Sequence, residues 1–414
     1  MTKLIGNAIV GQSGGPTAAI NATLAGVVRG ALEISKEKNG CIKTLFGMRN
    51  GIDGLLDETF VDLNEVFADE KNIDALEHTP AAALGSCRHK LPSLETGKDT
   101  YFKILEIFKK YDIRYFFYIG GNDSMDTVAK LSAFMKDQDY DMRLMGIPKT
   151  IDNDLCITDH TPGFGSAAKY IATTIQEVIR DCAVYRIPAV TIVEVMGRDA
   201  GWLAASAGVG EFAGLPSPDL VYLPEKAFDM DAFFEDVEKA LAKHPNVVVC
   251  VSEGIRFADG RYVGETGERA VDVFGHAASL SGAGKALEGA VKAKFGCKVR
   301  SIELSLPQRC ASHIASATDI SDSVSIGRAA VHAACDGVSG KLMIYKRVSS
   351  APYKCEMSYA DIDLVANKVK GVYDEYINER ANGITAACAE YILPLIEGEA
   401  YPEYENGLPK FFTI

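Results

Sequence analysis

Two polar turns carry the side chains in this sequence that are best suited to chemistry. The first, residues 120–124, reads Gly-Gly-Asn-Asp-Ser, and the second, residues 146–154, reads Gly-Ile-Pro-Lys-Thr-Ile-Asp-Asn-Asp. Each turn follows a short apolar run, at residues 114–119 and 142–147, that predicts a buried strand. Glycines, a lysine and closely spaced carboxylates are the groups that phosphoryl transfer between two anionic small molecules requires.

The first turn leads into a predicted helix, because Val128, Leu131 and Phe134 follow it with helical spacing. A glycine turn before a helix exposes backbone N–H groups where no Cβ blocks a phosphate. The turn differs from the Walker phosphate loop, since the sequence has no Gly-x-x-x-x-Gly-Lys-Ser/Thr here. Taken alone, it could equally be a tight connection between a strand and a helix.

The second turn is more specific, because Lys149, Asp152 and Asp154 come directly after Pro148. Carboxylates two residues apart on an extended chain share a side. One of them could act as a general base toward a hydroxyl while the other approaches a metal ion or its waters. Lys149 could neutralise the charge of a transferring phosphoryl group. The alternative is a solvated turn with an aspartate cap.

Two further segments could bind anions. Residues 11–16, Gly-Gln-Ser-Gly-Gly-Pro, precede a helical pattern that runs from Thr17 to about Leu32, and glycines and a proline at this place suit an anion-binding helix start. The spacing is not that of a dinucleotide fingerprint. Residues 84–88 end in Arg88, whose guanidinium could reach phosphate oxygens.

These motifs together resemble the phosphofructokinase family. The family carries Ser-Gly-Gly, Gly-x-x-Arg, Gly-Gly-Asp-x-Ser, Pro-x-Thr-Ile-Asp-Asn-Asp, Met-Gly-Arg, Ser/Thr-Glu-Gly and Gln-Arg elements in this order. Here they start at Ser13, Gly85, Gly120, Pro148, Met196, Ser252 and Gln308. The matches cover residues 4 to about 310, most of the chain.

The resemblance is to the pyrophosphate-dependent branch of that family. ATP-dependent members usually have glycine where this chain has Asp123 and Lys149. A side chain at the first position occupies space that a nucleotide needs, and a cation at the second balances the charge of a pyrophosphate transition state. Asp123 is therefore expected to exclude ATP and Lys149 to stabilise the transition state.

The resemblance implies a role for each matching residue. Asp152 is expected to accept the proton of the 1-hydroxyl of fructose 6-phosphate. The residues expected to bind pyrophosphate are Gly14, Gly15, Arg88, Gly121 and Ser124. Those expected at the sugar phosphate are Thr150, Ile151, Asp152, Met196, Gly197, Arg198, Glu253, Arg300, Leu306 and Arg309. Magnesium is expected near Asn122 and Asp154, held largely through phosphate oxygens and waters.

Several positions depart from the family pattern. Asn122 replaces the usual aspartate, Ala189 replaces an arginine that reaches across a subunit interface, and Leu306 replaces a histidine or tyrosine. Cys310-Ala311 replaces the Gly-Gly after the Gln-Arg element, and Arg186 is a candidate substitute for the arginine missing at position 189. These departures keep two alternatives open: an ATP-dependent 6-phosphofructokinase and a non-catalytic regulatory subunit that binds a sugar phosphate.

Composition narrows the choice of partners and compartment. The net charge of −13 argues against nucleic acid or an anionic membrane as a main partner. Ten cysteines without Cys-x-x-Cys pairing predict reduced thiols and a cytoplasmic protein. We expect no leader at residues 1–10 and no membrane span. His89 and His160 lie near motifs and are expected to be structural or at the pocket rim. The resemblance implies a homodimer.

Strand and helix patterns alternate along the chain, which predicts an α/β fold with parallel sheets covered on both faces. We expect two Rossmann-like three-layer domains with mostly parallel sheets and the active site in the cleft between them. Residues 1–148 are expected to form the pyrophosphate half and 149–340 the fructose 6-phosphate half, with the chain crossing back between them. Residues 341–414 are expected to pack as a C-terminal extension, with helices at 364–376 and 385–393.

Overall fold

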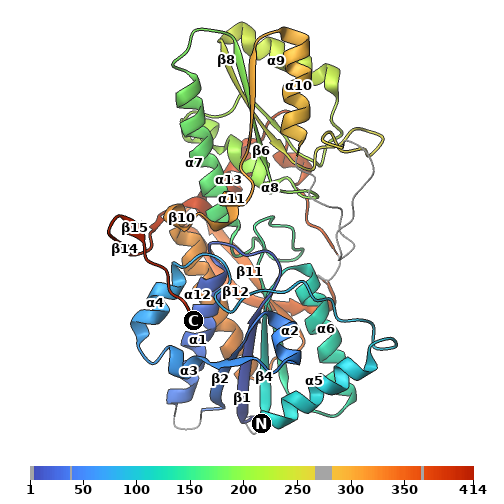
Figure 1. Cartoon of the computed structure of the whole chain (residues 1–414), viewed down its shortest axis with the longest axis vertical. Coiled ribbons are helices and arrows are strands. Elements are labelled where there is room, and N and C mark those ends of the chain that lie inside the picture. Colours follow the sequence, from blue (N-terminus) through green and yellow to red (C-terminus); the bar gives the residue numbers. More distant parts are fainter. Residues whose placement is uncertain (1–3, 38–39, 266–281, 365–367) are drawn as a thin grey trace.

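The computed structural model describes residues 4–37, 40–265, 282–364 and 368–414. The chain forms two lobes, each built on one large sheet, and the N-terminal strand lies in the lower lobe of Figure 1. This arrangement confirms the predicted α/β fold with two mostly parallel sheets. Among the described residues, no helix has both the length and the apolar character needed to cross a membrane.

The larger sheet has seven strands. Their spatial order is β12 (Tyr353–Asp361), β11 (Lys341–Ser350), β5 (Arg143–Pro148), β4 (Ile113–Gly120), β1 (Gly6–Gln12), β2 (Ile42–Met48) and β3 (Phe60–Asp62). The five central strands pair in parallel, and only the outermost strands β12 and β3 pair antiparallel to their neighbours. Because parallel strands place their carboxyl ends at one edge, the turns after β1, β4 and β5 share that edge.

Helices cover both faces of the seven-stranded sheet. One face packs against α1 (Ile20–Lys36), α3 (Leu63–Val66), α4 (Glu70–Glu77) and α12 (Ala317–Cys335), and its core includes Val10, Phe117 and Ile147. The other face packs against α2 (Gly51–Leu56), α5 (Lys98–Lys110) and α6 (Asn122–Asp137), and its core includes Ile9 and Phe116. Successive residues of β1 and β4 therefore enter opposite cores, as the period of a strand requires.

The smaller sheet has four parallel strands in the order β7 (Leu220–Tyr222), β8 (Asn246–Ser252), β6 (Ala189–Val195) and β9 (Lys298–Glu303). One face packs against α7 (Phe164–Cys182), α8 (Trp202–Ser206), the short helix η1 (Ala207–Ala213) and α13 (Ala386–Ile392). The other face packs against α9 (Met230–Lys243) and α10 (Ala283–Phe295). Both lobes are thus three-layered, with buried strands between helices.

The remaining elements are short. They are α11 (Pro307–Cys310), η2 (Ser312–Ile314), η3 (Ile362–Leu364), η4 (Asp374–Tyr376), η5 (Leu393–Ile396), and the strand pairs β10 (Ala315–Ser316) with β13 (Glu399–Ala400) and β14 (Tyr404–Glu405) with β15 (Leu408–Pro409). The helix expected at 385–393 is confirmed by α13. The long helix expected at 364–376 is wrong for the described part of that segment, because residues 368–373 are irregular.

The C-terminal part of the chain returns to the first lobe. Helix α12 packs against α1, and β11 then pairs in parallel with β5. Residues 341–361 therefore complete the seven-stranded sheet instead of lying outside it as an extension. The division of the chain into functional halves at residue 148 stays a prediction, and the strand order places that residue at the end of β5.

Candidate active site

A pocket of about 370 Å³ lies where the turns after β1, β4 and β5 meet. Its lining residues come from four segments of the first lobe: 13–15, 87–89, 121–124 and 149–154, the last contributing Lys149, Thr150 and Asp154. The four segments are those in which the sequence predicted anion binding. The fold brings them together because parallel strands deliver their turns to one edge of the sheet.

The glycine turns are held close to one another. The hydroxyls of Ser13 and Ser124 are hydrogen-bonded, which joins the turn after β1 to the first turn of α6. Gly14 has a φ of 77°, and its backbone N–H donates to the carbonyl of Cys87 at 3.1 Å. Gly121 is the residue before α6 and lines the pocket. The first backbone N–H groups of α6 therefore lie at the pocket. Such a surface suits phosphate oxygens.

Lys149 extends from the end of β5 to the first glycine turn. Its ammonium donates a hydrogen bond of 2.5 Å to the carbonyl oxygen of Gly15, and only 3% of the residue is exposed. Burial lowers the pKa of Lys149 to about 8, and the negative charges of Asp152 and Asp154 oppose that shift. Lys149 is therefore a buried cation fixed in the wall of the pocket at neutral pH.

Asp152 is half-buried beside Lys149 in the same turn. Burial raises the pKa of the Asp152 carboxyl to about 7, with further increases from the charges of Asp154 and Glu253 and an opposing effect from Lys149. A carboxylate with a pKa near neutrality is suited to accept a proton from a hydroxyl. The backbone N–H of Asp152 donates to the hydroxyl of Thr150 at 3.1 Å.

Asp123 lies in the first turn of α6 with its carboxylate 3.1 Å from the ammonium of Lys90. The sequence reasoning missed Lys90, which has no motif around it beyond its closeness to Arg88. Asp123 and Arg88 both line the pocket, and the ion pair of Asp123 with Lys90 lies at its exposed side.

The residues expected near magnesium suit an oxygen-coordinated cation. The side-chain oxygen of Asn122 is buried and accepts no hydrogen bond from any described residue, while its amide nitrogen donates to the carbonyl of Lys368 at 3.3 Å. Asp154 lines the same pocket. No group of three or more His, Cys, Asp or Glu side chains in the described part of the chain could hold a metal ion. A cation here would need ligands from a substrate or water.

In the second lobe, hydrogen bonds join the turn after β6 to the turn after β8 and to α11. After β6, the backbone N–H of Met196 donates to the side chain of Gln308 at 3.1 Å, and that of Gly197 donates to the Glu253 carboxylate at 3.3 Å. Burial raises the pKa of Glu253, and the bond from Gly197 and the charge of Arg198 oppose the increase. The sequence reasoning named Gln308 only as part of its motif and gave it no role.

Arg309, in α11, lies close to the pocket of the first lobe. Its guanidinium lies 3.4 Å from the point that a Cβ on Gly15 would occupy. The charge of Arg309 also contributes to the lowered pKa of Lys149, and Glu253 contributes to the raised pKa of Asp152, so both second-lobe residues act electrostatically on the turn after β5.

Comparison with known proteins gives a consistent result. The family model for phosphofructokinase matches residues 7–334. The chain belongs to the phosphofructokinase family. It is 42% identical over 410 residues to the pyrophosphate–fructose 6-phosphate 1-phosphotransferase of Methylococcus capsulatus, with 99% of this chain and 96% of that protein covered. The predicted resemblance is confirmed.

Two further proteins are similar to this chain. The crystal structure of a pyrophosphate-dependent phosphofructokinase from Nitrosospira multiformis superimposes with a TM-score of 0.87 at 38% identity, covering 98% of this chain and 96% of that one. A sulfofructose kinase of Alkalicoccus urumqiensis is 30% identical, over 90% of this chain and 92% of that protein.

Three residues that the phosphofructokinase resemblance placed at the sugar do not line the pocket between the glycine turns. Arg300 lines a different pocket, of about 220 Å³, together with residues of α7, and its guanidinium lies 4.0 Å from Asp181. The side chain of Ile151 is buried in the core beside α7. Leu306 is 55% exposed at the start of α11. Arg186 is exposed between α7 and β6.

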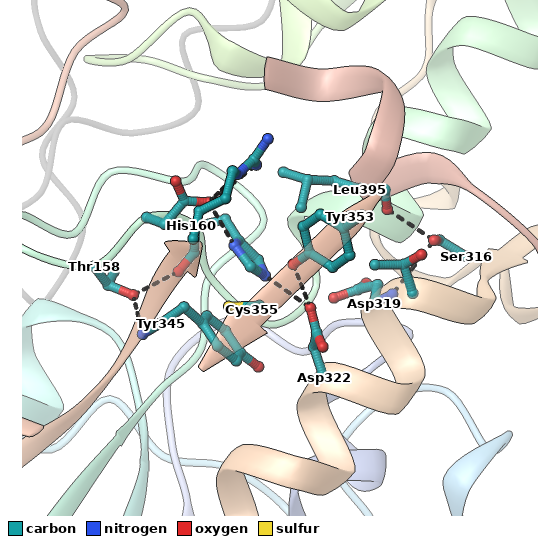
Figure 2. A network of polar contacts seen from close by, with 12 residues as sticks. Thr158, His160, Ser316, Asp319, Asp322, Tyr345, Tyr353, Cys355 and Leu395 are labelled. Atoms are coloured by element: carbon teal, nitrogen blue, oxygen red, sulfur yellow. Dashed lines mark hydrogen bonds and ion pairs between the residues drawn. The ribbon is translucent and has the colours of Figure 1, made fainter. Parts of the chain in front are cut away.

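His160 is a structural residue, as expected. Figure 2 shows its ring between the strands of the β11–β12 hairpin and α12. One ring nitrogen is 2.9 Å from Asp159 and the other is 3.4 Å from Asp322, while the ring stacks on Tyr345 at 4.1 Å between centroids. Asp322 also accepts a hydrogen bond of 2.6 Å from Tyr353. This network anchors the segment that follows the turn of Asp152 and Asp154. His89 lines the pocket itself.

Proposed function

We propose that this protein catalyses the reversible transfer of a phosphoryl group from pyrophosphate to the 1-hydroxyl of fructose 6-phosphate, which yields fructose 1,6-bisphosphate and phosphate. The proposal is supported by membership of the phosphofructokinase family and by the names of the relatives at 42% identity. The observation that carries it is that Lys149 and Asp123 line one pocket, with Asp152 in the same turn as Lys149.

Asp152 is the proposed proton acceptor. As the O–P bond to the sugar forms, the proton of the 1-hydroxyl moves to the Asp152 carboxylate and the bond to the leaving phosphate breaks. Lys149, fixed on the Gly15 carbonyl, would balance the negative charge shared between the incoming and leaving oxygens. In the reverse direction Asp152 returns the proton to the sugar oxygen, so the same residues serve both directions.

The glycine turns form the proposed pyrophosphate site. Gly14, Gly15, Gly121 and Ser124 would surround the phosphates, because glycines let the backbone come close to them, with Arg88 at the edge. Asn122 and Asp154 would hold Mg²⁺, since one offers an unpartnered buried oxygen and the other a carboxylate in the same pocket. Bound magnesium would neutralise charge on the phosphate oxygens.

Donor choice would rest on Asp123 and Lys149. The carboxylate of Asp123, paired with Lys90, occupies the side of the pocket where the rest of a nucleotide would lie. A phosphate group there would also meet like charge, which disfavours ATP more than the smaller pyrophosphate. The ATP-dependent alternative would require this carboxylate to move away.

Residues of both lobes would bind fructose 6-phosphate. Thr150 and the backbone at Ile151 would approach it from the turn of Asp152. Met196, Gly197, Arg198 and Glu253 would contact the sugar, and Arg309 would hold the 6-phosphate. This arrangement supports an active site in a cleft between the two lobes. Leu306 would contribute at most its apolar side chain.

Arg300 supports the proposal of a homodimer. Within its own protomer this arginine lines the pocket beside α7, with an exposed side chain. If it binds the sugar phosphate, it does so in a second copy of the chain. We also propose the cytoplasm as the compartment, in line with ten cysteines that show no Cys-x-x-Cys pairing in the sequence.

The experiment is an assay of purified protein with magnesium and fructose 6-phosphate, with either pyrophosphate or ATP as donor. Turnover with pyrophosphate supports the proposal, and turnover with ATP alone contradicts the roles of Asp123 and Lys149. If neither donor supports turnover, the non-catalytic alternative is favoured. Because one relative is a sulfofructose kinase, the sulfonate analogue of the sugar belongs in the same assay.

Asp152→Asn tests the base within that assay. The amide keeps the size of the side chain but cannot accept the proton, so kcat should fall by on the order of a hundredfold or more. Retained fructose 6-phosphate binding, measured calorimetrically, shows that the variant is folded. Wild-type turnover in this variant would remove Asp152 from the mechanism.

A further inference from the structure

The segment 368–372, here called the buttress, crosses the structure directly behind the turn of Asp152. It follows η3 in the sequence and lies beyond residues 7–334, which the family model matches. Its backbone contacts reach both glycine-rich turns, since the carbonyl of Lys368 accepts from Asn122 at 3.3 Å and the N–H of Lys370 donates to the carbonyl of Asp154 at 2.7 Å.

The second lobe holds the buttress from the other side. The indole N–H of Trp202, at the start of α8, donates to the carbonyl of Lys370 at 2.9 Å. The Glu225 carboxylate accepts from the N–H of Val372 at 2.8 Å and from that of Gly201 at 2.7 Å. The buttress therefore connects the α8 start, just after the Met-Gly-Arg element, to the turn of Asp152 and Asp154.

The side chain of Lys370 is buried at the centre of these contacts, with 8% of the residue exposed. Its ammonium donates to the side-chain oxygen of Asn153 at 3.2 Å and to the carbonyls of Thr158 at 3.1 Å and Asp159 at 2.8 Å. An ammonium has three hydrogens to donate, so these acceptors match its capacity. Burying a charge is costly unless it is fully hydrogen-bonded, and here the chain supplies every partner from one loop.

Asn153 connects Lys370 to the turn that carries Asp152 and Asp154. It lies between Asp152 and Asp154 and has a left-handed backbone with a φ of 53°. Its amide nitrogen donates to the hydroxyl of Tyr391 at 2.8 Å, while its oxygen accepts from Lys370. A residue in this conformation needs contacts that hold it there. Loss of one of the two contacts would let the turn relax and move both carboxylates.

We infer that Lys370 is a positioning residue for phosphoryl transfer, which acts through Asn153 to hold the Asp152 and Asp154 carboxylates in place. This inference rests on the proposed function. It assigns a role in catalysis to a segment of the chain that the sequence analysis treated as a packed extension. Lys370 is not among the residues that line the pocket, so its loss should lower kcat more than it weakens substrate binding.

Lys370→Met tests the inference, and Lys346→Met is the control because Lys346 is an exposed lysine of β11. With pyrophosphate as donor, Lys370→Met should lower kcat by on the order of tenfold to a hundredfold, with each KM changed less than about threefold. Lys346→Met should keep wild-type kinetics. A kcat unchanged per folded molecule, with only a lower melting temperature, overturns the inference.

A double-mutant cycle separates positioning from general destabilisation. If Lys370 acts through Asn153, the loss of kcat in Lys370→Met combined with Asn153→Ala should be no larger than the greater of the two single losses. Additive losses overturn the inference. If Lys370→Met does not fold, Asn153→Ala alone decides, because an unchanged kcat in that variant would also overturn it. Inactivity of the wild-type protein would instead contradict the proposed function.

Discussion

The Lys149 ammonium donates a 2.5 Å hydrogen bond to the carbonyl oxygen of Gly15. This bond connects the end of β5 to the turn after β1, two strands away in the seven-stranded sheet. It fixes a positive charge at the point where the glycine turns meet, before any substrate binds. A preorganised charge of this kind stabilises a transition state without the cost of reorienting when the reaction occurs.

Lys149→Met should therefore reduce turnover more than binding. Removing a single preorganised donor from an active site typically lowers kcat by about a hundredfold to a thousandfold. We expect a loss of this order with pyrophosphate and a KM for fructose 6-phosphate within a few-fold of wild type, measured by steady-state kinetics. Lys346→Met, which removes an exposed lysine of β11 in the same sheet, is the control. An equal loss in both variants would contradict the role of Lys149.

Asp123→Gly combined with Lys149→Gly should shift donor preference toward ATP. The first change removes the carboxylate that Lys90 holds at 3.1 Å over the pocket, and the second removes the cation suited to pyrophosphate. We expect the ratio of kcat/KM for ATP to that for pyrophosphate to rise by on the order of a hundredfold, mostly from the loss with pyrophosphate. The ratio is measured with both donors at saturating fructose 6-phosphate.

The control for that experiment is Asp126→Asn, which removes a carboxylate from the same helix. Asp126 pairs with Lys130 at 2.7 Å and lies outside the lining of the pocket. Its loss should leave the donor ratio unchanged. A ratio that moves equally in both variants would mean that the overall charge of α6, and not the position of Asp123, determines donor choice.

The central strands could be predicted from the sequence because they are buried on both faces. The runs at 114–119 and 142–147, which precede the two polar turns, correspond to β4 and β5. Continuous apolar runs of this kind are typical of parallel sheets. The turns after them were recognisable because glycines and charged residues follow the runs directly.

The C-terminal strands could not be predicted in the same way. In β12, exposed and half-buried residues alternate, and its place at the edge of the sheet depends on pairing with β11, which in turn pairs with β5 almost 200 residues earlier. Nothing local in the sequence specifies that partner. Helical spacing at 364–376 was misleading for a related reason: the N–H groups of Lys370 and Val372 bond to Asp154 and Glu225 instead of to helical carbonyls.

The positions of the two arginines in the protein also depend on how the strands pair. Arg300 and Arg309 lie in one short segment, and the sequence assigned both to the sugar phosphate. Strand β9 directs Arg300 toward α7, while α11 places Arg309 beside Gly15. Which face of a strand a side chain occupies depends on the register of that strand, and this register is set by pairing with β6.

Gly14→Ala should impair use of pyrophosphate. A Cβ at this position would lie 3.2 Å from the Lys149 ammonium, and the φ of 77° is unfavourable for alanine. We expect kcat/KM for pyrophosphate to fall by about tenfold or more, because both the glycine turn after β1 and the lysine must shift. Gly260→Ala is the matched control, since its φ is 85° and no described heavy atom lies within 4 Å of the added Cβ.

The two glycine variants separate backbone strain from site geometry. Each should lose about 1 kcal/mol of stability from the left-handed conformation. Only Gly14→Ala should lose activity, measured at a temperature where both variants are folded. If Gly260→Ala lost as much activity as Gly14→Ala, general backbone strain would explain the effect. The proposed pyrophosphate site at the glycine turns would then lose this support.

The His160 network should make stability depend on pH. Burial by itself lowers the pKa of His160, but its hydrogen bond with Asp159 and its ion pair with Asp322 outweigh burial and raise the pKa above its usual value. Asp319 also faces this imidazole, and Tyr345 stacks on its ring. Because the folded pKa is raised, the contribution of the imidazolium to stability is fully present below about pH 6.5, the unfolded value, and is lost as the pH rises through the folded pKa.

His160→Gln should therefore destabilise the protein more at pH 6 than at pH 9. Loss of the charged contacts should cost about 1.5–3 kcal/mol at pH 6 and less at pH 9, because this contribution declines as the pH rises through the folded pKa. Urea midpoints of wild type and variant at the two pH values measure the difference. His244→Gln, which removes an exposed ion pair with Asp219, should cost less than about 1 kcal/mol at either pH. An equal cost of His160→Gln at both pH values would mean that packing against Tyr345, and not charge, is what His160 contributes.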